Sequence, residues 1–231
     1  MPLYPTRSQK LQTLQRPLLY LITDGKTTSR TTPATDDFSK VLHLVQSAVS
    51  AGIDLVQIRE KKLSAGVLYE LSESAARLTR GSATKLLIND RSDIAAAAGA
   101  DGVHLTAHSL PAEVVRRTLG DDFLIGVSTH AVQEGGVARN SGADFVVFGP
   151  VFETTSKSEY GPPQGLSNLE KVCLELAPFP VLALGGLTIE NVTDCLDAGA
   201  QGVAGIGMFG DPDRLVEVVN NIRESARQES A

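Results

Sequence analysis

Short apolar runs alternate with longer amphipathic stretches from Leu18 to the C-terminal part of this chain. Apolar runs rich in Val, Ile and Leu are typical of buried strands, whereas apolar residues three or four positions apart indicate helices. The runs predict strands over Leu18–Thr23, Leu55–Ile58, Leu86–Ile88, Gly102–Leu105, Leu124–Val127, Phe145–Phe148, Val181–Leu184 and Val203–Ile206. The stretches between them predict helices over Asp37–Ser50, Ala65–Arg80, Ser92–Ala98, Pro111–Leu119, Ala131–Ser141, Leu166–Leu176, Ile189–Ala198 and Pro212–Arg227.

A recurring phrase marks the joint between a helix and the following strand. It reads Ala51-Gly52-Ile53-Asp54, Ala98-Gly99-Ala100-Asp101, Ser141-Gly142-Ala143-Asp144 and, more loosely, Ala198-Gly199-Ala200-Gln201. Glycine directly after a helix suits a left-handed terminating position. Alternating strands and helices with a repeated joint predict an α/β fold, a single-domain (β/α)8 TIM barrel over residues 16–231. An open doubly wound sheet is the alternative, and residues 1–15 predict a loose N-terminal extension or an extra element.

Composition narrows the classes of partner. The net charge of −6 over 231 residues, without a basic stripe, argues against nucleic acid. No apolar run approaches the ~20 residues of a membrane span, so we expect no membrane partner. The two cysteines, Cys173 and Cys195, have neither metal nor redox spacing, and we expect a protein of the reducing cytoplasm. A small anionic ligand remains compatible with this acidic chain, and a homo-oligomer stays open.

The end of the second predicted strand carries the most informative polar group. Gln57, Arg59 and Lys61 alternate with apolar residues and therefore project to one side. A guanidinium and an ammonium together can hold a polyanion, although a strand end with charges that only reach water is the alternative. In a barrel, the active site lies at the carboxyl ends of the strands, which favours the anion site.

Other strand ends carry polar residues or glycines too. Asn89 and Asp90 follow the third strand, where Asp90 could hold Mg²⁺ beside a diphosphate or could cap the next helix and pair with Arg91. His104 and His130 are the histidines at strand ends; each is an acid–base candidate, and a hydrogen-bonded wall residue is favoured for His104. The remaining candidates are the glycines of a phosphate site, Gly185, Gly186 and Gly207 with Ile206, and the loop Val151–Gln164 with Thr154, Ser156 and Lys157.

Several motifs together resemble the thiamine phosphate synthase family and its relatives, the TenI-type thiazole tautomerases. They are V-Q-I-R-E-K at Val56–Lys61, I-N-D-R at Ile88–Arg91, A-D-G-V-H-L at Ala100–Leu105, G-V-S-T-H at Gly126–His130 and F-G-P-V-F-x-T-x-S-K at Phe148–Lys157. The resemblance extends from about Leu18 to Ile222, which is nearly the whole chain.

This resemblance implies a reaction and a role for each residue. The synthase joins a hydroxymethylpyrimidine diphosphate to a thiazole phosphate and releases diphosphate, with Mg²⁺ bound. The resemblance assigns the pyrimidine diphosphate to Gln57, Arg59, Lys61, Asn89 and Lys157, and the metal to Asp90. It assigns the junction between the substrates to Ser128, Thr154 and Ser156, and the thiazole phosphate to Gly185, Gly186, Ile206 and Gly207.

Two departures from the family pattern keep alternatives open. The synthases carry a second metal-binding carboxylate where this chain has Ser109, and a phosphate-binding serine where it has Gly207. Both departures favour a tautomerase, in which His130 would move the proton on a carboxylated thiazole phosphate. Lys61 and Asp90 favour the synthase, because a tautomerase has no diphosphate to bind. A non-catalytic binder of thiamine-pathway phosphates is the third alternative.

Overall fold

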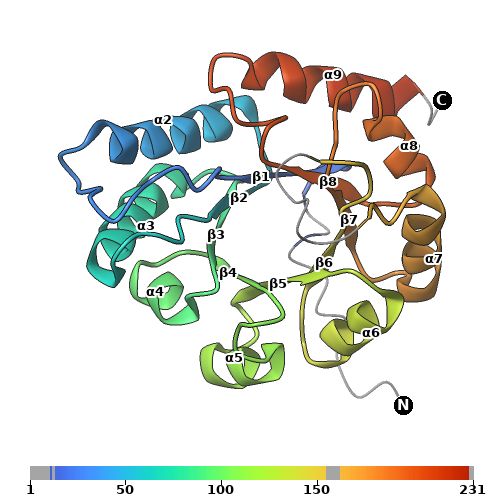
Figure 1. The fold of residues 1–231 in the computed structure, drawn as a ribbon, viewed down its shortest axis with the longest axis horizontal. Coiled ribbons are helices and arrows are strands. Elements are labelled where there is room, and N and C mark those ends of the chain that lie inside the picture. The colour runs from blue at the N-terminus through green and yellow to red at the C-terminus, as the bar shows by residue number, and fades with distance from the viewer. Residues whose placement is uncertain (1–10, 12–13, 155–161, 229–231) are drawn as a thin grey trace.

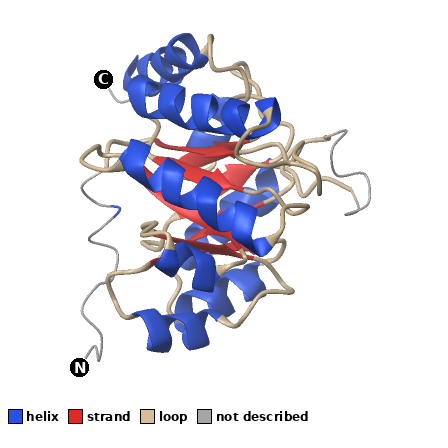
Figure 2. Cartoon of the chain, turned by 90° about the vertical axis from the view of Figure 1, so that its left-hand side faces the viewer, coloured by secondary structure: helices blue, strands red, loops and turns tan. Residues whose placement is uncertain are grey.

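The computed structural model describes residue 11, residues 14–154 and residues 162–228. In these residues eight parallel strands pair in chain order, and β1 pairs with β8, so that the sheet closes into a barrel (Figure 1). Helices surround the barrel on its outside (Figure 2). The (β/α)8 prediction is therefore confirmed, and the open doubly wound sheet is wrong.

The strands and helices lie close to their predicted positions. The strands are β1 Leu18–Ile22, β2 Leu55–Ile58, β3 Lys85–Asn89, β4 Gly102–Leu105, β5 Leu124–Thr129, β6 Phe145–Phe148, β7 Val181–Leu184 and β8 Gly202–Gly205. The helices are α2 Asp36–Ala51, α3 Ala65–Thr79, α4 Ser92–Ala97, α5 Ala112–Leu119, α6 Val132–Asn140, α7 Leu166–Leu176, α8 Val192–Asp197 and α9 Leu215–Gln228. None of the helices in the described residues is long and apolar enough to cross a membrane.

Two boundaries differ for identifiable reasons. Helix α8 begins at Val192 and not at Ile189, because the amide oxygen of Asn191 accepts a hydrogen bond from the Thr188 backbone and closes a turn before the helix. Strand β5 extends to Thr129, because Ser128 and Thr129 pair in register with residues of β6. Ser128 therefore lies within a strand, which fixes its direction more firmly than a loop would.

The alternation of side chains along each strand divides the core into two layers. Outward residues such as Leu19 and Leu21 pack against the helices, whereas Leu18 and Tyr20 face the barrel interior. Leu11, in the predicted N-terminal extension, is fully buried against this inner cluster. The inner cluster also contains Ile22, Leu55, Leu87, Leu124, Phe145, Val147, Leu182 and Ala204.

The acidic residue of the repeated joint phrase has a structural role. The carboxylates of Asp54, Asp101 and Asp144 accept hydrogen bonds from the backbone N–H groups of Leu19, Leu86 and Ile125, at 2.8, 2.9 and 2.7 Å. Each acceptor thereby ties its joint to a residue near the start of the neighbouring strand. Each also has a cationic partner: Arg223 for Asp54, Lys85 for Asp101 and Arg116 for Asp144.

These joints differ in burial, which predicts different costs of mutation. The Arg116–Asp144 pair is buried, with the two side chains 7% and 2% exposed, and Arg116 also donates to the carbonyl groups of Phe123 and Gly142. Asp144→Asn leaves this guanidinium without its counter-charge, so we expect a loss of about 3–5 kcal/mol in the free energy of unfolding. Asp101→Asn, whose carboxylate is one third exposed, should cost about 1 kcal/mol or less. Urea denaturation at neutral pH measures both, and equal losses would contradict this interpretation.

Candidate functional site

The mouth of the barrel holds a cavity of about 150 Å³, and its floor is the uppermost inward layer of the strands. One half of this floor is polar and comes from neighbouring strands β2 to β5; its residues are Gln57, Asn89, His104 and Ser128. The other half is apolar and comes from β1, β7 and the end of β8; its residues are Ile22, Leu184 and Ile206. A cavity with one polar and one apolar side suits a flat heterocycle that carries a polar substituent.

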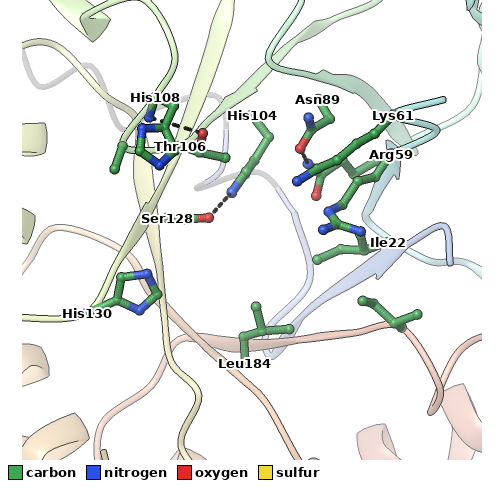
Figure 3. A pocket seen from close by; sticks show the side chains of 13 residues that line it. Ile22, Arg59, Lys61, Asn89, His104, Thr106, His108, Ser128, His130 and Leu184 are labelled. Carbon is green, nitrogen blue, oxygen red and sulfur yellow. Dashed lines mark hydrogen bonds between the residues drawn. The ribbon is translucent and has the colours of Figure 1, made fainter. Parts of the chain in front are cut away.

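The residues at the end of β2 enter this cavity together. Gln57 is buried in the floor, and Arg59 and Lys61 line the cavity above it, as their alternation along the chain predicts (Figure 3). The Gln57 side-chain amide donates to Asn89 Oδ1 at 3.1 Å. This bond leaves the Asn89 N–H groups and the Gln57 carbonyl available to a ligand.

Glu60 supports this group from behind, a role that the sequence reasoning missed. Its carboxylate is buried and accepts hydrogen bonds from the backbone N–H groups of Gly25 and Thr27 and, at 2.6 Å, from the Thr27 hydroxyl. The Arg59 backbone N–H donates to the Thr23 hydroxyl at 2.8 Å. Both sets of bonds hold the segment after β1 beside Arg59. The strand alternation that places Arg59 inward also places Glu60 on the opposite side, and that signal could have identified it.

The charge of Lys61 is affected by two described neighbours of opposite sign, Arg59 and Asp90. Partial burial lowers the pKa of Lys61, the neighbouring charge of Arg59 lowers it further, and Asp90 partly offsets both effects. The charge of Arg59 therefore disfavours the charged form of Lys61 in the free protein. A bound anion relieves this repulsion, and a diphosphate does so more fully than a single carboxylate.

Asp90 occupies an unusual backbone conformation directly after β3. Its φ of 66° lies in the left-handed region, which Asp tolerates better than most residues and which is frequent at functional sites. The predicted alternative for this residue is wrong: α4 has Arg91 at its N-cap without a side-chain capping bond, and Arg91 hydrogen bonds to Asp93 at 2.6 Å. No hydrogen bond to the Asp90 carboxylate comes from the part of the chain that the structure describes.

The surroundings of Asp90 limit what metal site this chain can build. Asp90 lines a hollow next to the main cavity together with His108 and Ser109, and His108 lines both spaces. The Ser109 hydroxyl is engaged, because it accepts a hydrogen bond from the Thr106 backbone at 2.8 Å. Across the described ranges, no group of three or more His, Cys, Asp or Glu residues could hold a metal ion. One carboxylate still fits Mg²⁺, which often takes most of its ligands from substrate phosphates and water.

The two histidines of the strand ends differ in their environment. His104 is buried, and its ring nitrogens contact the Tyr20 hydroxyl at 3.2 Å and Ser128 Oγ at 2.9 Å. It therefore has the contacts expected of a wall residue. His130 is partly exposed and its Nδ1 contacts the Gly149 carbonyl at 2.5 Å. A carbonyl only accepts, so it is Nδ1–H that donates in this contact.

The predicted phosphate glycines line a second cavity of about 300 Å³ at the ends of β7 and β8. Leu184 and Ile206 line both cavities, so the two spaces adjoin at these residues. Gly185, Gly186, Gly207 and Thr154 lie in the second cavity, as predicted. Ser156 and Lys157, two other predicted site residues, lie outside the described residues.

Comparison with known proteins agrees with this geometry. A family model described as thiamine monophosphate synthase matches residues 19–209. This chain belongs to the thiamine monophosphate synthase family. The resemblance inferred from the sequence motifs is therefore confirmed.

Individual members of the thiamine monophosphate synthase family resemble the chain over most of its length. A Geobacter sulfurreducens protein with a provisional name as a thiamine-phosphate synthase is 46% identical over 84% of this chain and 88% of its own. A thiamine-phosphate synthase of Methanoculleus marisnigri is 39% identical over 89% of this chain and 93% of its own. A solved structure described as thiamine phosphate pyrophosphorylase from Pyrococcus furiosus has a TM-score of 0.75 and 28% identity, and the match covers 97% and 98% of the two chains.

The glycines of the second cavity provide a matched pair of mutations. A Cβ at Gly186 would lie 2.4 Å from the Glu153 carbonyl oxygen, and its φ of +65° disfavours side chains, whereas a Cβ at Gly207 meets nothing within 4 Å. We therefore expect Gly186→Ala to weaken binding of a phosphate ligand by about tenfold or more, or to destabilise the fold by over ~1 kcal/mol. Gly207→Ala should change the free energy of unfolding by no more than ~0.5 kcal/mol, because its Cβ meets no protein atom. Calorimetric titration and urea denaturation measure the effects, and a tolerated Gly186→Ala would contradict the proposed close approach of the backbone.

Proposed function

We propose that this chain is a thiamine-phosphate synthase, which joins a hydroxymethylpyrimidine diphosphate to a thiazole phosphate and releases diphosphate. The observation that carries this function is the adjacency of two anion-binding spaces. Arg59 and Lys61 lie at the first cavity, glycines line the second, and the two spaces adjoin at Leu184 and Ile206. A synthase needs two phosphorylated substrates side by side, whereas a tautomerase needs a single phosphate site.

The residues of the first cavity divide the work of binding the pyrimidine diphosphate. Arg59 and Lys61 would hold the diphosphate, and the Gln57–Asn89 amide pair would orient the pyrimidine ring. When the methylene–oxygen bond breaks, its electron pair leaves with the diphosphate and the pyrimidine becomes a cation. The fixed charges of Arg59 and Lys61 stabilise the departing diphosphate without having to reorganise.

The second cavity would hold the thiazole phosphate and direct its ring nitrogen toward that cation. Backbone groups of Gly186 and Gly207 would bind the phosphate, with Thr154 at the junction of the substrates. The thiazole nitrogen then forms the new carbon–nitrogen bond. Holding two reactants in this arrangement converts a bimolecular encounter into an effectively unimolecular step.

The donor set supports Mg²⁺ as a partner of the diphosphate and does not support a preformed metal cage. Asp90 would hold the metal through its one carboxylate. This carboxylate is close enough to Lys61 to raise the pKa of the lysine. When bound, Mg²⁺ would neutralise part of the charge on the diphosphate. We also propose a cytoplasmic location, which the two free and buried cysteine thiols support.

The tautomerase remains a second candidate because of one specific observation. His130 lines the cavity, and its Nδ1–H donates to the Gly149 carbonyl, which orients the imidazole at the cavity wall. In that reaction His130 would move a proton on a carboxylated thiazole phosphate, and the cationic pair would have no diphosphate to bind. A non-catalytic binder would take up the phosphate ligands without either turnover.

Turnover of the purified chain distinguishes these functions. With the pyrimidine diphosphate, the thiazole phosphate and Mg²⁺, we expect release of diphosphate and formation of thiamine phosphate. Asp90→Asn should lower the rate at least about tenfold, because it removes the carboxylate that meets the metal. Asp93→Asn is the matched control, since Asp93 is exposed and bonds Arg91. The tautomerase would be the correct function if the chain interconverts the thiazole tautomers without releasing diphosphate and if His130→Asn abolishes that interconversion.

Binding of inorganic pyrophosphate tests the role of the metal without turnover. Mg²⁺ should tighten pyrophosphate binding to the wild-type chain and to Asp93→Asn, but much less to Asp90→Asn. An equal effect of Mg²⁺ on all three proteins would show that Asp90 does not bind the metal. It would not contradict the rest of the proposed function.

The lowered pKa of Lys61 predicts a pH dependence with a definite sign. A lysine with a lowered pKa loses its proton at a lower pH than an ordinary lysine. Pyrophosphate affinity should therefore start to fall at a pH below about 10.4, the ordinary pKa of lysine. Lys61→Arg keeps its charge to higher pH and should move this fall upward. Lys62→Arg, an exposed neighbour outside the cavity lining, is the control. Calorimetric titration across pH ~7 to ~10 measures the profile, and identical profiles for all three proteins would exclude Lys61 from the anion site.

A further inference from the structure

Three side chains from three strands form a hydrogen-bonded series from the barrel interior to the cavity. The Tyr20 hydroxyl of β1 meets His104 Nδ1 of β4 at 3.2 Å, and His104 Nε2 meets Ser128 Oγ of β5 at 2.9 Å. Tyr20 belongs to the inner core cluster, whereas His104 and Ser128 line the cavity (Figure 3). The series thus connects a buried phenol to a hydroxyl at the predicted junction of the substrates.

The packing around this series holds its members in place. Tyr20 is fully buried, and its ring lies 5.7 Å from that of Phe145 in an edge-to-face arrangement. Gly126 leaves room for the neighbouring rings, because a Cβ there would lie 2.8 Å from His104 Nδ1 and 2.4 Å from the Phe145 ring. Burial raises the pKa of Tyr20 well above its usual value, so the phenol keeps its proton.

The hydrogen-bond capacities of the three groups decide the direction of the bonds. Within the described residues, the Tyr20 hydroxyl has the His104 ring as its only polar partner. If His104 Nδ1 carried the proton, the Tyr20 hydrogen would point into the apolar inner cluster without an acceptor, at a cost of about 1–3 kcal/mol. Tyr20 therefore donates to Nδ1. A neutral imidazole then carries its proton on Nε2 and donates it to Ser128 Oγ.

We propose that Tyr20 and His104 are positioning residues that make Ser128 a hydrogen-bond donor toward the substrate. One lone pair of Ser128 Oγ is taken by the His104 N–H, so its own O–H turns toward the cavity. The site should therefore select a substrate with a lone-pair acceptor at this point, such as a ring nitrogen or a bridging oxygen, over one with an N–H group. This inference rests on the proposed function for the identity of that substrate.

The position of the series favours a role in the site over a role in stability alone. A Tyr–His pair is costly in an apolar interior, and apolar residues of similar shape would fill the same volume without desolvating polar groups. Ser128, the last member of the series, also lines the cavity. The cationic residues Arg59 and Lys61 follow β2, so a neutral donor on β5 can contact the uncharged part of a ligand whose anionic part they would hold.

Nuclear magnetic resonance of the histidine ring nitrogens tests the bond directions without any turnover. In the free wild-type chain, His104 should carry its proton on Nε2 and have an unprotonated Nδ1. His104→Gln identifies the signal among the four histidines. Tyr20→Phe keeps the aromatic packing and removes the donor, so the His104 nitrogen shifts should move toward a mixture of tautomers. A His104 proton on Nδ1 in the wild-type chain would overturn the proposal.

A double-mutant cycle in the synthase assay tests the action of Tyr20 through Ser128. Tyr20→Phe should lower kcat about three- to tenfold, the value of one hydrogen bond, with KM changed less than about twofold. In a Ser128→Ala background the same mutation should change kcat less than about twofold, because the hydroxyl that it orients is gone. Equal losses in both backgrounds would show a merely structural effect and overturn the proposal.

Stability measurements and the wild-type synthase assay distinguish a folding defect, a failure of the proposed function and a failure of this inference. Urea denaturation of each variant shows whether Tyr20→Phe remains folded; if it does not, the wild-type His104 tautomer decides the question alone. A wild-type chain without synthase turnover would overturn the proposed function, while the tautomer of His104 would still confirm or overturn the bond directions.

Discussion

Parallel closure of the sheet is the constraint on which the rest of this molecule depends. Closure forces every second residue of each strand into the barrel interior and brings the carboxyl ends of all strands to one mouth. The lower interior positions can be apolar, as Leu18, Leu55 and Leu124 are. The uppermost positions border a cavity, and on one half of its floor they are polar. The site is therefore the last layer of the core, built with residues that need partners.

Burial and charge are balanced differently at the two ends of the barrel. At the joints between helices and strands, each of the three aspartates has both a backbone donor and a cation, so the charges are satisfied within the fold. At the mouth, burial and the charge of Arg59 lower the pKa of Lys61, and Asp90 offsets only part of this effect. This difference separates structural from functional ionic groups better than residue type does, because both ends use the same kinds of side chain.

The sequence predicted most of the fold and which candidate residues gather at the barrel mouth, because both depend on local pattern. Alternation identified the strands, and closure then placed Gln57, Arg59 and Lys61 in one cavity. What escaped prediction depends on register across the barrel. In the sequence, Tyr20 fits the apolar pattern of the first strand. Nothing near it in the chain indicates that its hydroxyl contacts His104 on β4. Glu60 escaped for a similar reason, since its partners lie on the segment after β1, over thirty residues earlier in the chain.

The departures of this chain from its family follow from the same structure. The sequence resemblance implies a metal-binding carboxylate where this chain has Ser109, and the Ser109 hydroxyl accepts a hydrogen bond from the Thr106 backbone. With Asp90 as its single metal-binding carboxylate, the proposed site would carry less fixed negative charge than a site with two. Such a site would bind a free cation more weakly and attract an anion more strongly, because less negative charge would offset that of Arg59 and Lys61. A metal that enters with its diphosphate supplies the missing ligands from the substrate, so loss of the second carboxylate is compatible with an intact anion site. The cationic residues Arg59 and Lys61 and the single carboxylate of Asp90 are therefore consistent with one mode of binding.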